Sequence, residues 1–147
     1  MELDVIEVLL EHLSERMKMY KFSKRSLDNL KNVDQRLVDI CNELIKEIDF
    51  TVIEGYRTLE RQKELFDTGF SKIDGIKKKG KHNYSPSLAI DIIPYKKGHN
   101  PFDGSEESTK MFKELNKSFD KVAKKLGIKY EWGGSWKTFV DLPHYQV

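Results

Sequence analysis

Apolar residues recur at helical spacing in three stretches of the chain. Their stripes are Val5, Leu9, Leu10, Leu13 and Met17 in residues 1–21; Leu37, Ile40, Cys41, Leu44, Ile45 and Ile48 in and just after residues 34–47; and Met111, Leu115, Phe119, Val122, Ala123 and Leu126 in residues 106–126. This spacing puts the apolar side chains on one face of a helix. We expect all three helices to pack against a core. For the first helix, a role at a membrane surface or in partner binding is the alternative.

Strands are expected at residues 49–56 and 88–93, between the second and third of these helices, and at residues 128–132 and 136–141, after the third. The first two alternate between two faces, which is the strand period. A fourth helix is expected at about 58–68, where Thr58 can cap its start and Gly69 can end it. Residues 22–31 are expected to be connecting structure, with Ser23 or Ser26 as a possible cap, and residues 69–81 and 94–105 to be loops. The predicted fold is therefore α+β, in one domain spanning residues 1–147.

Composition narrows the function classes only slightly. The 147 residues carry a net charge of +2 and a single cysteine. So small a charge does not favour nucleic acid. Cys41 lies within an apolar helical stripe, so we expect a buried thiol and no nucleophile. The chain shows neither a signal peptide nor a membrane span, so we expect synthesis in the cytoplasm and no stable membrane insertion.

Two histidines and two carboxylates lie next to predicted strands. If Ile90 and Ile92 face the core, Asp91 points to the other face, and the turn Ser85-Pro86-Ser87 can bring His82 over that face. Two imidazoles and a carboxylate form a normal catalytic zinc set. We expect His82, Asp91 and His144 as ligands, and Asp141 as the general base. Positions 141 and 144 would lie on opposite faces of a straight strand, so a bend is needed, and Pro143 favours one.

Spacing alone does not settle this site against isolated hydrogen-bonded residues. His99 is the best rival as a ligand, but no predicted strand holds it beside an acidic residue, and we expect it to be exposed. His12 is expected at the surface. The lysines of the loop 69–81 (Lys77, Lys78, Lys79 and Lys81) lack interleaved aromatic residues, so a solvated loop is favoured over nucleic-acid binding, with steering of an acidic ligand toward His82 as a further role.

Three motifs together resemble a known family. They are Glu54-Gly-Tyr-Arg57-Thr-Leu-Glu-Arg-Gln62, then His82-Asn-Tyr-Ser-Pro-Ser-Leu-Ala-Ile-Asp91, then Asp141-Leu-Pro-His144-Tyr-Gln. In this order, over residues 51–146, they resemble the zinc D-alanyl-D-alanine carboxypeptidases and L-alanyl-D-glutamate endopeptidases of bacterial cell walls, which include phage endolysins. Residues 1–21 lie outside the resemblance.

The resemblance implies a hedgehog/DD-peptidase-like fold: a small, mostly antiparallel sheet with helices on one side and Zn²⁺ on the other. It implies His82, Asp91 and His144 as zinc ligands, Asp141 as the base, and Arg57 holding the substrate carbonyl or its oxyanion. For Arg57, a surface salt bridge is the alternative from sequence alone. The substrate would be the peptidoglycan stem peptide, and a phage holin would let a monomeric enzyme reach the wall during lysis. Independently of the resemblance, the segment Trp132-Gly-Gly-Ser-Trp136 is expected to line the substrate groove, with core packing as the alternative for Trp132.

Two positions depart from the family pattern. Gly80 stands where a serine is common, and Ser-Pro-Ser makes the spacing from His82 to Asp91 longer by two residues. Both departures lie in or near a turn and leave the predicted ligands in place. The expected reaction is hydrolysis of the L-alanyl–D-glutamate bond. The alternatives are a D-alanyl-D-alanine carboxypeptidase and a non-catalytic zinc module that binds cell wall or a partner.

Overall fold

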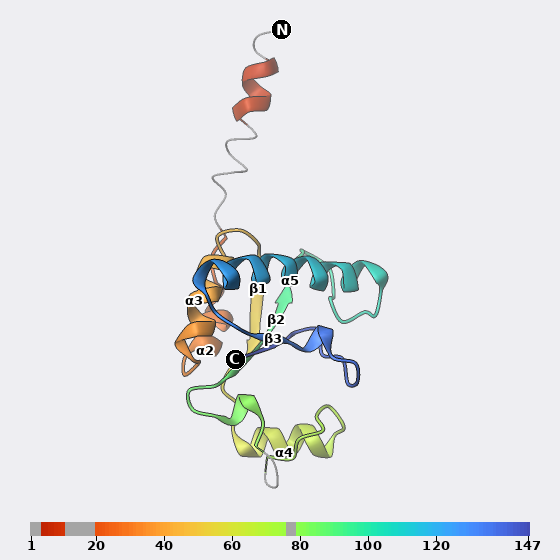
Figure 1. The fold of residues 1–147 in the computed structure, drawn as a ribbon. Coiled ribbons are helices and arrows are strands. Elements are labelled where there is room, and N and C mark those ends of the chain that lie inside the picture. The colour runs from red at the N-terminus through yellow and green to blue at the C-terminus, as the bar shows by residue number, and fades with distance from the viewer. Residues whose placement is uncertain (1–3, 11–19, 76–78) are drawn as a thin grey trace.

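The fold is organised around a small antiparallel sheet, seen in a computed structural model that describes residues 4–10, 20–75 and 79–147 (Figure 1). Within these residues the strands are β1 (Phe50–Glu54), β2 (Ala89–Pro94), β3 (Glu131–Trp132) and β4 (His144–Gln146), in the spatial order β1-β2-β4-β3. The C-terminal strand β4 thus lies between β2 and β3. This order places the second and third sequence motifs on neighbouring strands.

Helices surround the sheet and begin at caps. They are α2 (Lys24–Leu30), α3 (Gln35–Leu44), α4 (Leu59–Asp67) and α5 (Glu106–Leu126), with 3₁₀ turns η1 (Lys81–Asn83) and η2 (Gly133–Ser135). The side chains of Ser23, Thr58 and Ser105 each accept a backbone N–H from the first turn of the helix that follows. Gly127 ends α5 in the left-handed conformation, at φ 70°. The predicted α3, α4 and α5 are confirmed.

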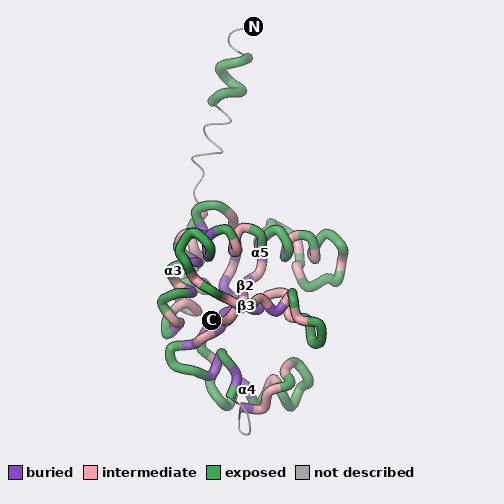
Figure 2. The backbone as a smooth tube through the Cα atoms, viewed as in Figure 1, coloured by how far each residue is buried: buried purple, intermediate pink, exposed green. Residues whose placement is uncertain are grey.

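The core lies between the sheet and the pair α3 and α5 (Figures 1 and 2). Alternation along β2 is as expected: Ile90 and Ile92 are fully buried in this core, and Asp91 points to the opposite face. The same alternation along β4 buries Tyr145 between His144 and Gln146. The predicted α+β fold, with the core helices on one side of an antiparallel sheet, is confirmed.

Replacing Phe119 should show how much this core contributes to stability. Phe119 on α5 is fully buried, and its ring stacks on that of Tyr145 with centroids 4.0 Å apart. We expect Phe119→Ala to lower the free energy of unfolding by about 3–5 kcal/mol, because the change removes buried apolar contacts and leaves a cavity. Urea denaturation measures this loss. Phe70→Ala is the matched control: that ring is 76% exposed, and a loss as large as that of Phe119→Ala would contradict the assignment of the core.

The sequence predicted connecting structure at residues 22–31. This prediction is wrong, because the segment contains α2. This helix covers the open edge of β1: Ser26 Oγ accepts the N–H of Val52 at 2.9 Å, and Asn29 Nδ2 donates to the carbonyl of Val52 at 2.8 Å. Two side chains thereby satisfy backbone groups that an edge strand leaves unpaired. The seven residues of α2 are mostly polar and form no apolar stripe, so the sequence does not indicate this helix.

The predicted strand at 136–141 is also wrong. The segment turns after η2, Phe139 has a positive φ of 50°, and Asp141 N–H bonds to the carbonyl of Gly133 at 3.0 Å. The last strand begins instead at His144, because the turn ends at Pro143, whose carbonyl accepts the N–H of Ile92 from β2 at 2.9 Å. The strand expected at 128–132 is shortened to Glu131–Trp132.

Residues 4–10 are helical, which agrees with the predicted first helix. However, Val5, Leu9 and Leu10 are each more than half exposed, so these three do not make the core packing that the sequence predicted (Figure 2). The remainder of that stripe, Leu13 and Met17, lies outside the described residues, as do His12, Lys77 and Lys78.

Candidate metal centre

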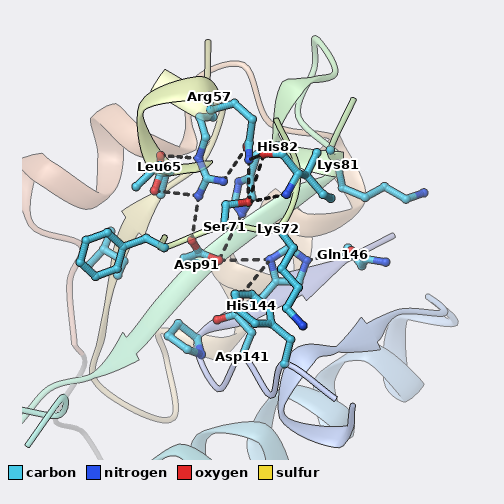
Figure 3. Close-up of a pocket in the computed structure, with 18 of the residues that line it drawn as sticks. Arg57, Leu65, Ser71, Lys72, Lys81, His82, Asp91, Asp141, His144 and Gln146 are labelled. Atoms are coloured by element: carbon cyan, nitrogen blue, oxygen red, sulfur yellow. Dashed lines mark hydrogen bonds and ion pairs between the residues drawn. The ribbon is translucent and has the colours of Figure 1, made fainter. Parts of the chain in front are cut away.

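Three side chains from separate parts of the chain converge on one point (Figure 3). Asp91 on β2 and His144 on β4 are directly paired across the two strands, so their side chains lie on the same face of the sheet. His82 reaches them from η1. One possible ligand atom from each residue lies within 4.8 Å of the other two. The structure therefore brings together the three residues that the sequence predicted as metal ligands.

The ring of His82 is held by a backbone carbonyl. Its Nδ1 lies 2.8 Å from the carbonyl oxygen of Gly55, which can only accept, so Nδ1 carries a proton and Nε2 is the nitrogen that faces the other two residues. Nε2 lies 3.2 Å from Asp91 Oδ1. Gly55 is required here, because a Cβ at this position would stand 2.0 Å from the backbone oxygen of Asn29. The His82 carbonyl in turn accepts the N–H of Arg57 at 2.8 Å, which ties η1 to the end of β1.

The ring of His144 has the opposite orientation. Its Nδ1 faces Asp91 Oδ1 at 3.3 Å, while its Nε2 lies 2.8 Å from Oε1 of Gln146. The two imidazole rings are 5.1 Å apart between centroids. His82 is thus set to bind through Nε2 and His144 through Nδ1, and each second nitrogen is occupied by an oxygen acceptor. Such outer contacts are typical of histidines that bind metals.

The electrostatics of the cluster favour a bound cation. Burial alone would raise the pKa of Asp91. The charge of His82 and the hydrogen bonds to both imidazoles together have a larger, opposite effect, so the pKa lies well below its usual range. Burial lowers the pKa of His144, but its hydrogen bond to Asp91 and the charge of that carboxylate outweigh this effect and raise the pKa. Positive charge is therefore stabilised between these residues. Two imidazole nitrogens and a carboxylate oxygen that converge in this way fit a divalent metal with an open fourth position.

Asp141 lies beside the cluster, on the turn before β4. The N–H of His144 bonds to its carbonyl at 3.2 Å, and this turn supplies the bend that a straight strand would lack. As a result Asp141 Oδ2 lies 4.0 Å from His144 Nδ1, with the side chain 34% exposed. Burial, and next the negative charge of Asp91, raise the pKa of the Asp141 carboxyl above its usual value. A carboxylate with this access and a raised pKa suits proton transfer at the site.

Arg57 also belongs to the site, although not as an exposed salt bridge. Its guanidinium is 10% exposed and makes a two-pronged contact with Glu54, through Nε at 2.7 Å and Nη2 at 3.0 Å. Nη1 donates to Gln62 at 2.9 Å, and Nη2 also reaches Asp91 Oδ2 at 3.4 Å. Arg57 thus contacts the oxygen of Asp91 that faces away from the histidines (Figure 3). Gln62 is itself buried and donates to Ser71 and to the carbonyl of Ile73, which fixes the neighbouring loop.

A cavity of about 570 Å³ opens onto the cluster. Its charged walls include Lys72, Lys79 and Lys81, and its aromatic walls include Phe70, Tyr84, Phe102, Trp136 and Phe139. The Lys72 ammonium lies over the ring of Phe139 at 5.1 Å, and that of Lys79 over Tyr84 at 4.9 Å. A ligand here would meet basic groups and flat apolar surfaces around the metal ligands and Asp141.

Several other sequence predictions are decided by the structure. Trp132 packs in the core and not in the cavity: its Nε1 donates to the carbonyl of Leu142, and its ring stacks on Tyr145. Trp136 is the tryptophan that lines the cavity. His99 is half-buried instead of exposed, because its Nε2 bonds to Ser108 at 2.7 Å; among the described residues it belongs to no metal-binding group. Cys41 is buried, which raises the pKa of its thiol to about 12 and confirms an unreactive side chain.

Sequence reasoning missed two residues that contact the site. Glu54 lies in the first motif but had no predicted role, and it holds Arg57. Gln146 had none either, and it accepts from His144. The period of a strand could have found Gln146, since it lies two residues after His144 and therefore on the same face. Nothing in the local sequence shows that Glu54 turns toward Arg57.

Comparison with known proteins gives consistent results. The family described as phage L-alanyl-D-glutamate peptidase matches residues 18–145. Peptidoglycan L-alanyl-D-glutamate endopeptidase CwlK of Bacillus subtilis (strain 168) is 34% identical over 112 residues, which are 69% of this chain and 62% of CwlK. The L-alanyl-D-glutamate peptidase of Escherichia phage T5 is 28% identical over 124 residues, which are 83% of this chain and 85% of that protein. The crystal structure of Serratia marcescens L-Ala D-Glu endopeptidase ChiX superimposes with a TM-score of 0.72 at 27% identity, covering 89% of this chain and 92% of ChiX.

Proposed function

Because the chain belongs to the phage L-alanyl-D-glutamate peptidase family and is an enzyme of that family, we propose that it hydrolyses the L-alanyl–D-glutamate bond of peptidoglycan stem peptides. The observation that carries the proposal is the convergence of His82, Asp91 and His144, with Asp141 beside them at the floor of a cavity. The relatives named above support the choice of bond, and the geometry of these four residues supports metal-assisted hydrolysis.

The metal in this proposal is zinc, held by His82 Nε2, Asp91 and His144 Nδ1. The donor set supports it: nitrogen and carboxylate ligands from three residues are the pattern of a catalytic zinc site. Bound there, zinc would supply a Lewis acid that polarises the scissile carbonyl and lowers the pKa of a water molecule to about 7. Proton transfer and binding of the substrate carbonyl are carried out by side chains of the protein itself.

Asp141 is the proposed general base and later the general acid. It accepts a proton from the attacking water, and it passes that proton to the nitrogen of the leaving D-glutamate. Its raised pKa and partial exposure support both steps, because a base works best when its pKa approaches the working pH.

Arg57 is the proposed partner of the substrate carbonyl oxygen. A guanidinium has five N–H donors, and Glu54, Gln62 and Asp91 occupy four of them. One Nη1 hydrogen is left for a substrate oxygen. Arg57 therefore combines two tasks: it orients Asp91, and it offers one hydrogen bond to negative charge that develops on the carbonyl.

The cavity supports an acidic peptide as the substrate. A stem peptide carries a free carboxylate on its glutamate residue, and Lys72, Lys79 and Lys81 line the wall around the metal ligands. Opposite charges of this kind attract the ligand and help to orient it.

Among the described residues, no helix is long and apolar enough to cross a membrane. In the proposed biology the enzyme is made as a monomer in the host cytoplasm, and a phage holin gives it access to the wall for lysis. The similarity to the phage T5 peptidase supports this part of the proposal.

Digestion of purified peptidoglycan tests the bond. We expect new alanine C-termini and new glutamate N-termini, detected by mass spectrometry of the released peptides, in reactions that contain Zn²⁺. Release of free D-alanine instead would identify a carboxypeptidase. Zinc binding without any cleavage would identify a binding module, and absence of zinc from the purified protein would overturn the proposed chemistry.

A further inference from the structure

A line of hydrogen bonds connects His144 to the wall of the cavity. His144 Nε2 bonds to Gln146 Oε1 at 2.8 Å, and Gln146 Nε2 donates to Glu131 Oε2 at 2.7 Å. The other oxygen of Glu131 accepts from Trp136 Nε1 at 3.0 Å. The ring of Trp136 also lies 5.1 Å from that of His144, measured between centroids.

The sheet register builds this line. Gln146 follows His144 by two residues on β4, so the two side chains share the face that carries Asp91. Glu131 is the cross-strand partner of Gln146 on β3, where their side chains are neighbours. After Trp132, η2 turns the chain back, so that the indole of Trp136 returns to Glu131. Two adjacent strand pairs thus join the proposed ligand to the cavity wall.

The direction of each hydrogen bond follows from the chemistry of the groups. A carboxylate only accepts, and Glu131 meets the indole N–H on one oxygen and the amide NH₂ of Gln146 on the other. The amide of Gln146 is therefore turned with its oxygen toward His144. A carbonyl oxygen requires a donor, so the hydrogen bond to Gln146 holds a proton on His144 Nε2 and leaves Nδ1, which faces Asp91 Oδ1 at 3.3 Å, as the nitrogen for a metal.

We propose that Glu131 is a positioning residue: through Gln146 it fixes the Nε2–H tautomer of His144, and through its other oxygen it holds Trp136 at the substrate wall. One exposed carboxylate would then set both a metal ligand and a surface of the cavity. The proposal rests on the proposed function in one respect, namely that His144 binds zinc through Nδ1.

Three variants separate these two tasks. Gln146→Leu removes the acceptor of His144 at similar size. Glu131→Ala removes both acceptors from an exposed position, so it leaves no buried group unpaired and should fold even if Gln146→Leu does not. Glu131→Gln keeps the shape but offers only one acceptor oxygen to two donors, so it should give an intermediate effect. Glu107→Gln is the matched control, because Glu107 is exposed and its side chain pairs with Lys96.

The first readout needs no metal. Nitrogen-15 NMR of the metal-free protein at alkaline pH, where the ring is neutral, reports which nitrogen of His144 carries the proton. We expect the Nε2–H tautomer in the wild type and in Glu107→Gln, and a mixture of tautomers in Gln146→Leu and Glu131→Ala. An unchanged tautomer in both of these variants would overturn the proposal. This holds whether or not the protein proves to be a peptidase.

The second readout is zinc affinity, measured by competition with a chelator. Loss of an outer partner of a metal-binding histidine costs about 10–100-fold in affinity, and we expect a weakening in this range for Gln146→Leu. For Glu131→Ala we also expect KM on a stem peptide to rise about 2- to 10-fold with kcat less affected, because one hydrogen bond that holds Trp136 is lost. If the wild type has the Nε2–H tautomer but does not bind zinc, the proposed function is contradicted, while the proposal that Glu131 and Gln146 fix the tautomer of His144 is still supported. Unchanged zinc affinity in Gln146→Leu together with unchanged KM in Glu131→Ala would refute the proposal that this line of hydrogen bonds positions His144 and Trp136.

Discussion

Asp141→Asn should abolish most hydrolysis of peptidoglycan while the protein keeps its zinc. The amide has the shape of the carboxylate but cannot take a proton from water, and general acid–base catalysis contributes about 10²–10⁴-fold to a rate. We therefore expect kcat to fall by about this factor. Zinc should stay, because Asp141 Oδ2 lies 4.0 Å from His144 Nδ1 and is not among the three converging ligands. Initial rates on a soluble stem peptide and zinc content by elemental analysis test the two halves of this expectation.

Asp67→Asn provides the control for that experiment. Asp67 lies on α4, is half exposed and pairs with Lys63, so its variant should match the wild type in rate and metal content. If Asp141→Asn retained more than a tenth of the wild-type rate, another residue would have to serve as the base. If it lost zinc, Asp141 would have to be counted as a ligand.

His82→Ala should remove both the zinc and the activity. Three protein ligands hold the proposed metal, and loss of one should weaken affinity by more than the roughly 10–100-fold that loss of an outer contact costs. The change also removes the shorter hydrogen bond to the Gly55 carbonyl and leaves it with the 3.3 Å bond from Ser87, and loss of one hydrogen bond costs about 0.5–1.5 kcal/mol. We expect a lower free energy of unfolding for the metal-free variant, as measured by urea denaturation. We also expect no thermal stabilisation when zinc is added, because a ligand stabilises only a fold that binds it.

His99→Ala is the matched histidine control. His99 is half-buried, bonds to Ser108 and is not one of the three converging residues, so this variant should keep full zinc content and wild-type hydrolysis. Stabilisation of His82→Ala by zinc to the same extent as the wild type would show that the metal is bound elsewhere. Loss of zinc in His99→Ala would have the same meaning.

The sequence by itself determined the features that depend on local periodicity and residue chemistry. Helices α3 and α5 follow from apolar stripes that only a helix can bury on one side, and β2 follows from the alternation around Ile90 and Ile92. The same alternation placed Asp91 on the face opposite the core. Together with two histidines next to turns, and with the resemblance of the three motifs to a known family, it predicted which four residues would meet. The structure brings those four residues together.

Only the tertiary structure decided the features that depend on contacts between distant segments. α2 was missed because its role is to cover the edge of β1 with Ser26 and Asn29, which a polar sequence does not reveal. The segment 136–141 contains strand-forming residues, yet it turns, because Gly133 binds the N–H of Asp141 and Pro143 binds β2. Likewise, the partners of Arg57 and the line from His144 to Trp136 exist because β1, β2, β4 and β3 lie side by side in that order. A sequence specifies which side chains can donate, accept or bind a metal, but strand order and register determine which of them meet.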